Sequence, residues 1–430
     1  MKQWMALLAL VAGSAPAIAQ PDAGSLLREQ ERQQRWLPDR LPDIEVRPVR
    51  PALKAVPGVR VVVKSVRFTG ATDLAPEPEL QAIVAYAIGR EVDFPGLEQL
   101  ARVDTDFLRG RGWFLAEAYL PKQDVTDGHI EIAIRPGRLD GKAGRGVPYK
   151  VVPTGKLALR IDSARLDTIA AGQLQPGAGA HEGDLERALL LMNDLPGVSA
   201  KARLEPGAEP GSTRVLVDVE EGPLLTGNVG VDNQGNRDTG TDQVNVSVQI
   251  NDPAGVGDQA SALATHAQGL DLARFAYVIP LGPGGLKLGA AFSAMDYRIL
   301  RGTGLAAGLK GSSGTAGLSL AYPFIRSRAR NLHGTLGLTY KALKDDSTAG
   351  PVKDKRIDAW NAGASGDALD GLGGGGMTSW NLGWTQGRLD LSRVATDQSA
   401  DAAGYNSQGR YAKLGYGLAR LQKLPQGLMF

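Results

Sequence analysis

The chain lacks the residues on which most metal and redox chemistry depends. It has no cysteine among its 430 residues, which excludes disulfides, thiolate metal sites and cysteine nucleophiles together. Histidine is scarce as well, and no histidine has a second ligand at i, i+4 spacing, so we expect no zinc site. The four histidines are His129, His181, His266 and His333.

Motifs of common enzyme classes are also missing. The sequence contains no Gly-x-Ser-x-Gly nucleophile elbow and no Walker-type phosphate loop. Gly302-Thr303-Gly304 followed by Gly308 has the wrong spacing for a dinucleotide loop, and no βαβ unit surrounds it. The acidic pairs Glu220-Glu221 and Asp345-Asp346 are typical of solvated loops. We therefore predict a protein that is not an enzyme and needs no cofactor.

Neither an excess of one charge nor a long apolar run is present in the body of the chain. The net charge of +2 argues against a nucleic-acid binder, which would carry a strong basic excess. No stretch after the N-terminus reaches the roughly 18 apolar residues of a spanning helix. At the N-terminus, Lys2, the apolar run Trp4–Ala12 and Ala17-Ile18-Ala19 predict a signal peptide over residues 1–19. The exported protein is then periplasmic, secreted or an outer-membrane barrel.

Two short N-terminal segments precede the folded regions. Residues 20–35 are rich in Glu, Gln and Arg and can form a helix with little apolar surface, which must dock on something or stay mobile. Residues 36–58 contain five prolines, a density that prevents helix or central strand and predicts an extended linker.

Two α+β modules are predicted next, over residues 59–141 and 142–222. The first has strands at 61–68, 113–120 and 129–134, and helices at 76–88 and about 97–110. The second has a short strand at 157–161, helices at 164–171 and 183–193, and strands at 200–204 and 213–219. Two tandem modules of one topology constitute an internal repeat.

Residues 223–430 change to period-2 alternation of apolar and small polar residues. Examples are Val244 to Ile250, Leu286 to Ala294, Leu318 to Phe324, Leu336 to Ala342 and Ala412 to Leu418. The 56 glycines suit many tight turns and crowded strands. Many such strands of about ten residues are typical of a membrane β-barrel, although the strands of a soluble sandwich alternate too.

The order of motifs resembles the two-partner secretion transporters, the ShlB/FhaC-type haemolysin and haemagglutinin secretion/activation family. The resemblance covers nearly the whole mature chain and lies in four ordered blocks. The block in the first module, similar to a polypeptide-transport-associated (POTRA) domain, contains Gly112, Tyr119, Pro121, Gln123 and Gly128. The block in the second contains Leu185, Leu195, Pro196 and Gly197. The opening barrel hairpins contain Asp232, Asn233, Gly235, Thr239 and Gly240. The later strands match at Tyr277 to Gly282 and Tyr322 to Arg326.

The resemblance implies a fold and a mechanism. It implies two tandem POTRA domains in the periplasm and an antiparallel transmembrane barrel in the outer membrane. The POTRA domains would capture an unfolded exoprotein, such as a large β-helical adhesin or haemolysin, and the barrel would conduct it. In this family the N-terminal helix plugs the lumen, which fits residues 20–35. The other expected partners are outer-membrane lipid, periplasmic chaperones and the barrel-assembly machinery. No nucleic-acid partner is expected.

One departure from the family concerns the barrel. The family has roughly sixteen strands, whereas about ten or eleven can be counted here, the last beginning near Leu428. An incomplete barrel leaves strand edges unpaired in lipid, so the sequence predicts a partial, C-terminally truncated barrel. A barrel-protein insertase of the same superfamily, and a periplasmic scaffold with a soluble β-domain, are the alternative functions.

Overall fold

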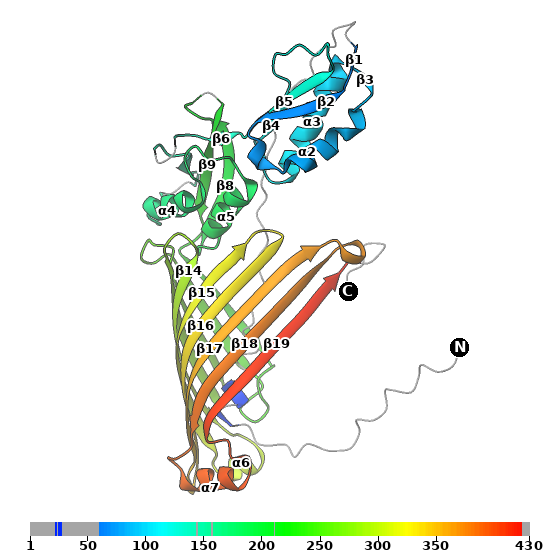
Figure 1. Ribbon diagram of the computed structural model, residues 1–430. Helices are drawn as coiled ribbons and strands as arrows, with labels where there is room; N and C mark the ends of the chain where they lie inside the picture. Colours follow the sequence, from blue (N-terminus) through cyan, green and yellow to red (C-terminus); the bar gives the residue numbers. More distant parts are fainter. Residues whose placement is uncertain are drawn as a thin grey trace, which may run out of the picture.

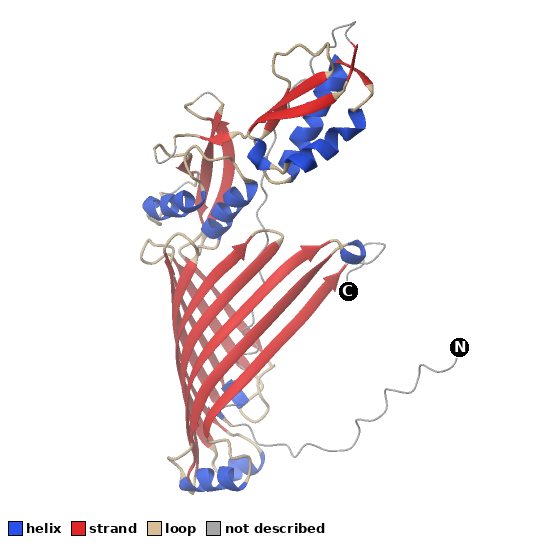
Figure 2. Ribbon diagram, viewed as in Figure 1, coloured by secondary structure: helices blue, strands red, loops and turns tan. Residues whose placement is uncertain are grey.

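The computed structural model describes residues 22, 23, 25–27, 60–142, 145–155, 158–209 and 211–423 (Figure 1). The predicted signal peptide, the proline-rich linker and the strand expected near Leu428 lie outside the described residues. Two α+β modules follow one another at one end of a large antiparallel sheet, and the helices between the strands of that sheet lie mainly at its other end (Figure 2).

The first module packs helices on one face of a three-stranded sheet. The sheet has the order β2-β5-β4, with β2 parallel to β5 and β4 antiparallel to it. Its elements are β1 (Arg60–Val62), β2 (Ser65–Gly70), η1 (Thr72–Leu74), α2 (Glu77–Val84), η2 (Ala85–Ala87), β3 (Glu91–Asp93), α3 (Phe94–Gly110), β4 (Glu117–Tyr119) and β5 (His129–Arg135). Asp93 caps α3 by accepting a hydrogen bond from the backbone N–H of Gly96.

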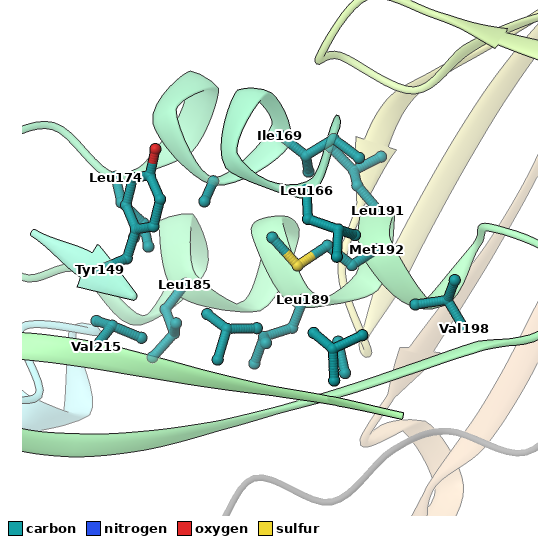
Figure 3. Close-up of a cluster of buried hydrophobic side chains, with 14 of the residues drawn as sticks. Tyr149, Leu166, Ile169, Leu174, Leu185, Leu189, Leu191, Met192, Val198 and Val215 are labelled. Atoms are coloured by element: carbon teal, nitrogen blue, oxygen red, sulfur yellow. The ribbon is translucent and has the colours of Figure 1, made fainter. Parts of the chain in front are cut away.

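The second module repeats this topology, as the sequence predicts. Here β7 is parallel to β9 and β8 is antiparallel to it, while β6 adds a short parallel pair. Its elements are β6 (Arg138–Leu139), β7 (Tyr149–Pro153), α4 (Ser163–Gln173), α5 (Glu182–Asn193), β8 (Val198–Pro206) and β9 (Ser212–Glu221). Figure 3 shows that Leu185 and Leu189 of α5 point towards the sheet, whereas Met192 lies beside Leu166 of α4. β6 lies before the predicted boundary at residue 141, yet it pairs with β9.

Two predicted strands in these modules are wrong. Residues 158–161 form no strand, and the strand that precedes α4 is β7, where Val151 and Val152 supply the β-branched residues. Residues 113–116 are a turn, so the strand predicted over residues 113–120 is limited to β4. In that turn the indole N–H of Trp113 donates to the carbonyl oxygen of Leu74 at 3.0 Å.

The remaining strands form one antiparallel sheet in sequence order, from β10 to β19. They are β10 (Leu225–Asp232), β11 (Gln243–Asn251), β12 (Gln259–Ala267), β13 (Leu270–Leu281), β14 (Leu286–Arg298), β15 (Lys310–Arg326), β16 (Arg330–Ser347), β17 (Gly350–Asp370), β18 (Gly376–Asp390) and β19 (Gly409–Gln422). Between them lie α6 (Gly302–Ala306), η3 (Leu372–Gly374) and α7 (Ala395–Ala403). A single sheet overturns the alternative of a soluble sandwich, which needs two packed sheets.

The two faces of this sheet differ in chemistry. One face carries exposed large apolar side chains, among them Val229, Phe275, Leu338, Trp360 and Leu418. We call it the outward face. The other, the inward face, carries polar side chains and contacts the helical segment formed by residues 22, 23 and 25–27. Because side chains alternate along a strand, the register assigns even-numbered residues of β14 to β19 to the outward face and odd-numbered ones to the inward face, except beyond the register shifts at Pro323/Ile325 and Asp345/Asp346.

Among the described residues, no helix is both long enough and apolar enough to cross a membrane.

Candidate functional site

The second module is held on one end of the sheet by a polar junction centred on Asp194, at the end of α5. The Nη2 and Nε of Arg326 donate to the two carboxylate oxygens of Asp194 at 2.6 and 2.9 Å. Lys287 Nζ donates to the carbonyl oxygen of Asp194 at 2.8 Å. Both partners of the ion pair are largely shielded, with 17% and 26% of their side chains exposed. This bidentate geometry fixes orientation as well as distance.

Further contacts join the same helix and the turns of the sheet. The backbone N–H of Arg328 donates to Glu186 at 2.9 Å, and Arg187 donates to the carbonyl oxygen of Pro323 at 3.0 Å. Gly257 lies so close to Leu195 that a Cβ there would stand 2.9 Å from its Cδ2. Three turns of the sheet therefore contact the second module, and we call this set of contacts the α5 junction.

Strand β8 has one paired edge and one free edge. Among the described strands it pairs only with β9. The side chain of Asn193 bonds both backbone groups of Ala200, accepting from its N–H and donating to its carbonyl oxygen, each at 2.9 Å. Ala200 therefore points its backbone away from β9. By the period of two, Ala202 and Leu204 also point theirs outwards, so their N–H and C=O groups form an open strand edge.

The first module repeats this use of an amide side chain. Gln123 accepts from the N–H of Glu131 and donates to its carbonyl oxygen, both at 2.7 Å. It thereby continues the short strand β4 along β5. On the opposite edge of that sheet, Gln81 donates to the carbonyl oxygen of Val66 at 3.0 Å. Val66 and, two residues on, Phe68 thus face away from β5, and the backbone of Phe68 forms a second open edge.

The inward face of the large sheet offers a polar, mainly basic wall. A cavity of about 550 Å3 there is lined by Arg274, Thr315, Lys341, Asn361 and Lys413, among others. Thr385 donates to Asn361 at 2.8 Å, and Asn361 donates to Thr339 at 3.2 Å, so the amide and hydroxyl groups of neighbouring strands satisfy one another. Such a surface suits water and a polypeptide in transit, because it offers many weak polar contacts.

The helical segment at residues 22–27 lies against this inward face. The N–H of Ala23 donates to Asp345 at 3.1 Å, and Lys353 Nζ lies 3.2 Å from a carboxylate oxygen of Asp22. Leu26 and Leu27 are buried against apolar residues of the sheet, which include Leu270, Leu272, Met295 and Tyr297. The few apolar residues expected in this segment are therefore the ones that dock.

The sequence-predicted motif residues fall into three groups in space. Gly112, with φ of +95°, lies at the contact between the modules: its carbonyl oxygen accepts from the N–H of Glu182 at 2.7 Å. Trp113 packs edge to face on His181 with ring centroids 5.0 Å apart. Tyr119 and Gln123 lie at the β4 edge, where Arg135 stacks over the Tyr119 ring, and Pro121 lies between them. Gly128 bonds Lys64 through its carbonyl oxygen at 2.7 Å.

The other two groups lie at opposite ends of the large sheet. Leu185 and Leu195 are core residues of the second module, and Pro196 and Gly197 form the turn that follows α5 beside Asn251. At the far end of the sheet, Asp232 accepts from Gln243 and Asn245 at 2.8 and 3.0 Å. Asn233 follows it in the loop over residues 233–242. Gly235, Thr239 and Gly240 line a small hollow beside Leu26.

Sequence reasoning did not find the residues that make the open edges and the α5 junction. Asn193 and Asp194 follow the apolar face of α5 without any motif of their own. Arg326 lies within a matched block, but its partner is 132 residues away, and no spacing rule reveals such a pair.

This architecture, with tandem POTRA-type modules at one end of a large antiparallel sheet that has an apolar outward face, defines a class of outer-membrane transport proteins. A family model described as haemolysin secretion/activation protein ShlB/FhaC/HecB matches residues 211–425, and a ShlB-type POTRA model matches residues 61–137. The chain belongs to this haemolysin secretion/activation family, whose members are two-partner secretion transporters rather than enzymes. It is accordingly an outer-membrane protein with its POTRA modules in the periplasm.

Individual relatives agree with this assignment. The heme/hemopexin transporter protein HuxB of Haemophilus influenzae is 26% identical over 97% of this chain and 72% of its own length. The outer membrane transporter CdiB of Dickeya dadantii is 27% identical over 63% of this chain and 46% of its own length. The solved structure of CdiB from Escherichia coli shares the fold, with a TM-score of 0.64 at 20% identity over 94% of this chain and 71% of that one.

Proposed function

We propose that this protein captures an unfolded exoprotein in the periplasm by strand addition at the open edge of β8 and passes it along the inward face of the sheet. The main support for this proposal is that the β8 edge belongs to the module that the α5 junction fixes to the sheet. Backbone pairing gives affinity without demanding one side-chain sequence. A captured segment is therefore delivered at a fixed place beside the polar wall.

The open edge of β2 provides a second point of capture in the same manner. An extended passenger could pair with β2 around Phe68 and then with β8 around Ala202. The periplasm holds no ATP, so folding of the exoprotein outside the cell would make the transfer irreversible. The passenger proposed here is a large β-helical adhesin or haemolysin, with periplasmic chaperones keeping it unfolded.

The helical segment at residues 22–27 acts in this proposal as a plug on the inward face. Its polar anchors are the ion pair of Asp22 with Lys353 and the bond from Ala23 to Asp345. Ion pairs of this exposure contribute about 1 kcal/mol or less, so most of the docking free energy comes from the buried Leu26 and Leu27, which an arriving passenger must displace. The predicted extent of the plug, residues 20–35, and the linker over residues 36–58 remain part of the proposal.

The experiment compares secretion by wild-type protein and the Ala202→Pro variant in cells that co-express an exoprotein of the two-partner secretion class. Proline removes the outward N–H of Ala202 and leaves the β8–β9 bonds in place, as edge strands tolerate. We expect secretion to fall at least tenfold while the protein level in the outer membrane is unchanged.

The matched control is Ala202→Val, which enlarges the side chain and keeps the N–H. It should secrete like wild type. Unchanged secretion by a folded Ala202→Pro variant would contradict capture at the β8 edge.

A further inference from the structure

The outward face of the sheet carries two rows of charged side chains that border an apolar band. Strand register places Asp358 beside Arg388, and Arg388 beside Arg410, in one row across β17, β18 and β19. A second row, formed by Asp370 and Arg420, lies near the ends of these strands that face the POTRA modules. Between the rows, β19 presents only Ala412, Leu414, Tyr416 and Leu418 on this face.

The separation of the rows matches a membrane. Arg410 and Arg420 are ten residues apart on one strand, which at about 3.3 Å per residue and a tilt of about 40° covers roughly 25 Å of thickness. This is about the height of the apolar band of an outer-membrane protein. The row of Arg388 and Arg410 therefore lies at the extracellular surface of the outer membrane, and Arg420 lies at the periplasmic surface.

The two rows differ in how their arginines are satisfied. At the periplasmic side, Arg420 donates to both carboxylate oxygens of Asp370, at 2.7 and 2.9 Å, and to the hydroxyl of Thr378. At the extracellular side, Arg388 and Arg410 have no ion pair or hydrogen bond from their side chains within the described part of the chain, and both are exposed. They are also direct cross-strand partners, an arrangement in which like charges repel.

An apolar groove begins beside this unpaired row. The groove has a volume of about 690 Å3 and is lined by Leu318, Leu338, Tyr340, Trp360, Arg388 and Arg410, and also by the carboxylate of Asp358, which lies opposite Arg388 on β17. Its apolar residues are widely exposed, with 54% of Leu318 and 62% of Leu338 accessible. Tyrosine and tryptophan at this depth are typical of the boundary between acyl chains and headgroups. The groove thus places an apolar trough next to two guanidinium groups.

We propose that this groove binds a phosphorylated glycolipid of the outer leaflet, with the chemistry of lipopolysaccharide. Its phosphate groups would lie between Arg388 and Arg410, and an acyl chain would lie against Leu318 and Leu338. Guanidinium groups bind phosphate in bidentate geometry, and a phosphate between them removes the repulsion of the opposed pair. The alternative occupant is a phospholipid whose headgroup has one phosphate, and the test must distinguish it from the glycolipid.

The test measures lipid binding to the full chain in detergent micelles by native mass spectrometry. The probes are bis-phosphorylated lipid A, the same glycolipid after removal of both phosphates, phosphatidylglycerol and inorganic phosphate. We expect wild-type protein to retain bis-phosphorylated lipid A at least tenfold better than any other probe. The double variant Arg388→Gln/Arg410→Gln should lose this preference. The double variant Arg388→Lys/Arg410→Lys keeps both charges but lacks the planar guanidinium groups, and its preference should be intermediate.

Arg420→Gln is the matched control, because it removes an outward arginine from the same strand at the other surface. Its preference for bis-phosphorylated lipid A should equal that of wild type. Heat-dependent gel mobility confirms that each variant is folded. Equal retention of phosphatidylglycerol, or an undiminished preference in the folded glutamine double variant, would overturn the proposal.

Discussion

The two POTRA modules share one topology but differ in their buried aspartates and in their attachments. In the first, Asp104 on α3 is fully buried, and neither carboxylate oxygen has a hydrogen-bond partner among the described residues. In the second, the buried Asp140 accepts from the N–H of Ala208 and from Ser212, both at 3.0 Å, and from Arg214 at 2.5 Å.

The electrostatic consequences are opposite. Burial raises the pKa of Asp104 to about 7. The backbone bond from Ala208 and the bonds from Arg214 and Ser212 hold the pKa of Asp140 well below its usual range. The first module therefore carries an uncompensated buried acid, and the second a compensated one.

The two modules also differ in what they are attached to. The second module contacts the sheet through the ion pairs of the α5 junction, whereas the first reaches the second through Gly112, Trp113 and His181. The comparison teaches that one repeated unit has been specialised in two ways. The second module is the fixed part that holds the β8 edge at the sheet, and the first is an added capture surface.

The largest expected effect comes from breaking the α5 junction. Asp194→Ala leaves Arg326 partly buried without its partner and should cost about 3 kcal/mol of the free energy that holds the second module on the sheet. Hydrogen–deuterium exchange of α5 and of residues 323–331 should rise. The control Arg203→Ala removes an exposed pair with Asp218 inside the module and should leave the exchange of α5 and of residues 323–331 unchanged. Equal exchange in both variants would refute the junction.

The contact between the two modules should be breakable without breaking the α5 junction. In Gly112→Val a side chain must adopt φ near +95° and would meet His181, 2.7 Å from the added Cβ. We expect a loss of about 2 kcal/mol, read as faster exchange at residues 111–116 and in the first turn of α5, whose Glu182 amide bonds Gly112, with residues 185–193 of α5 unchanged. Gly110→Ala, where an added Cβ meets nothing within 4 Å, is the control. Faster exchange of residues 185–193 in Gly112→Val would show that the modules do not separate as described.

The difference between the aspartates predicts a pH effect confined to the first module. Since the folded pKa of Asp104 lies above its unfolded value, its contribution to stability is present below about pH 4 and is lost as pH rises to about 7. Asp104→Asn should therefore increase the free energy of unfolding by about 1–3 kcal/mol at pH 8. The increase at pH 4 should be much smaller. Thermal unfolding at both pH values checks this, and an equal gain at both would contradict it.

The smallest effect distinguishes the two amide side chains at the strand edges. Gln123→Ala loses two hydrogen bonds at a partly exposed edge and should cost about 1 kcal/mol. Asn193→Ala loses a third bond, from its amide to the carbonyl oxygen of Leu189 at 2.7 Å, and should cost about twice as much. Chemical denaturation compares them. A larger loss for Gln123→Ala would contradict the assignment of the stronger amide contact to Asn193.

Part of this picture was predictable from the sequence. The period-2 runs in β11, β14, β15, β16 and β19 predicted both the strands and their apolar face, and the count of about ten or eleven strands agrees with the ten strands that the described residues form in this sheet. No alternating run marked β17, because its extracellular end carries charged residues on both faces, such as Lys355 and Arg356. A strand that extends beyond the membrane is solvated on both sides and has no reason to alternate.

The site was less predictable. Gly112 and Gln123 appeared as motif residues, but their roles depend on contacts with His181 and Glu131 that only the fold creates. Asn193 and Arg326 carry no local signal at all. Spacing predicts which residues share a strand or a helix face, whereas an edge cap or a distant ion pair depends on tertiary register.

The central claim is that an exoprotein passes along the inward face, and site-specific photo-crosslinking in secreting cells tests it most directly. A photoreactive residue is placed at Thr385 on the inward face or at Leu382 on the outward face of the same strand. The account predicts crosslinks to the co-expressed exoprotein from position 385 and none from position 382. Crosslinks from position 382, or none from position 385 while secretion continues, would contradict it.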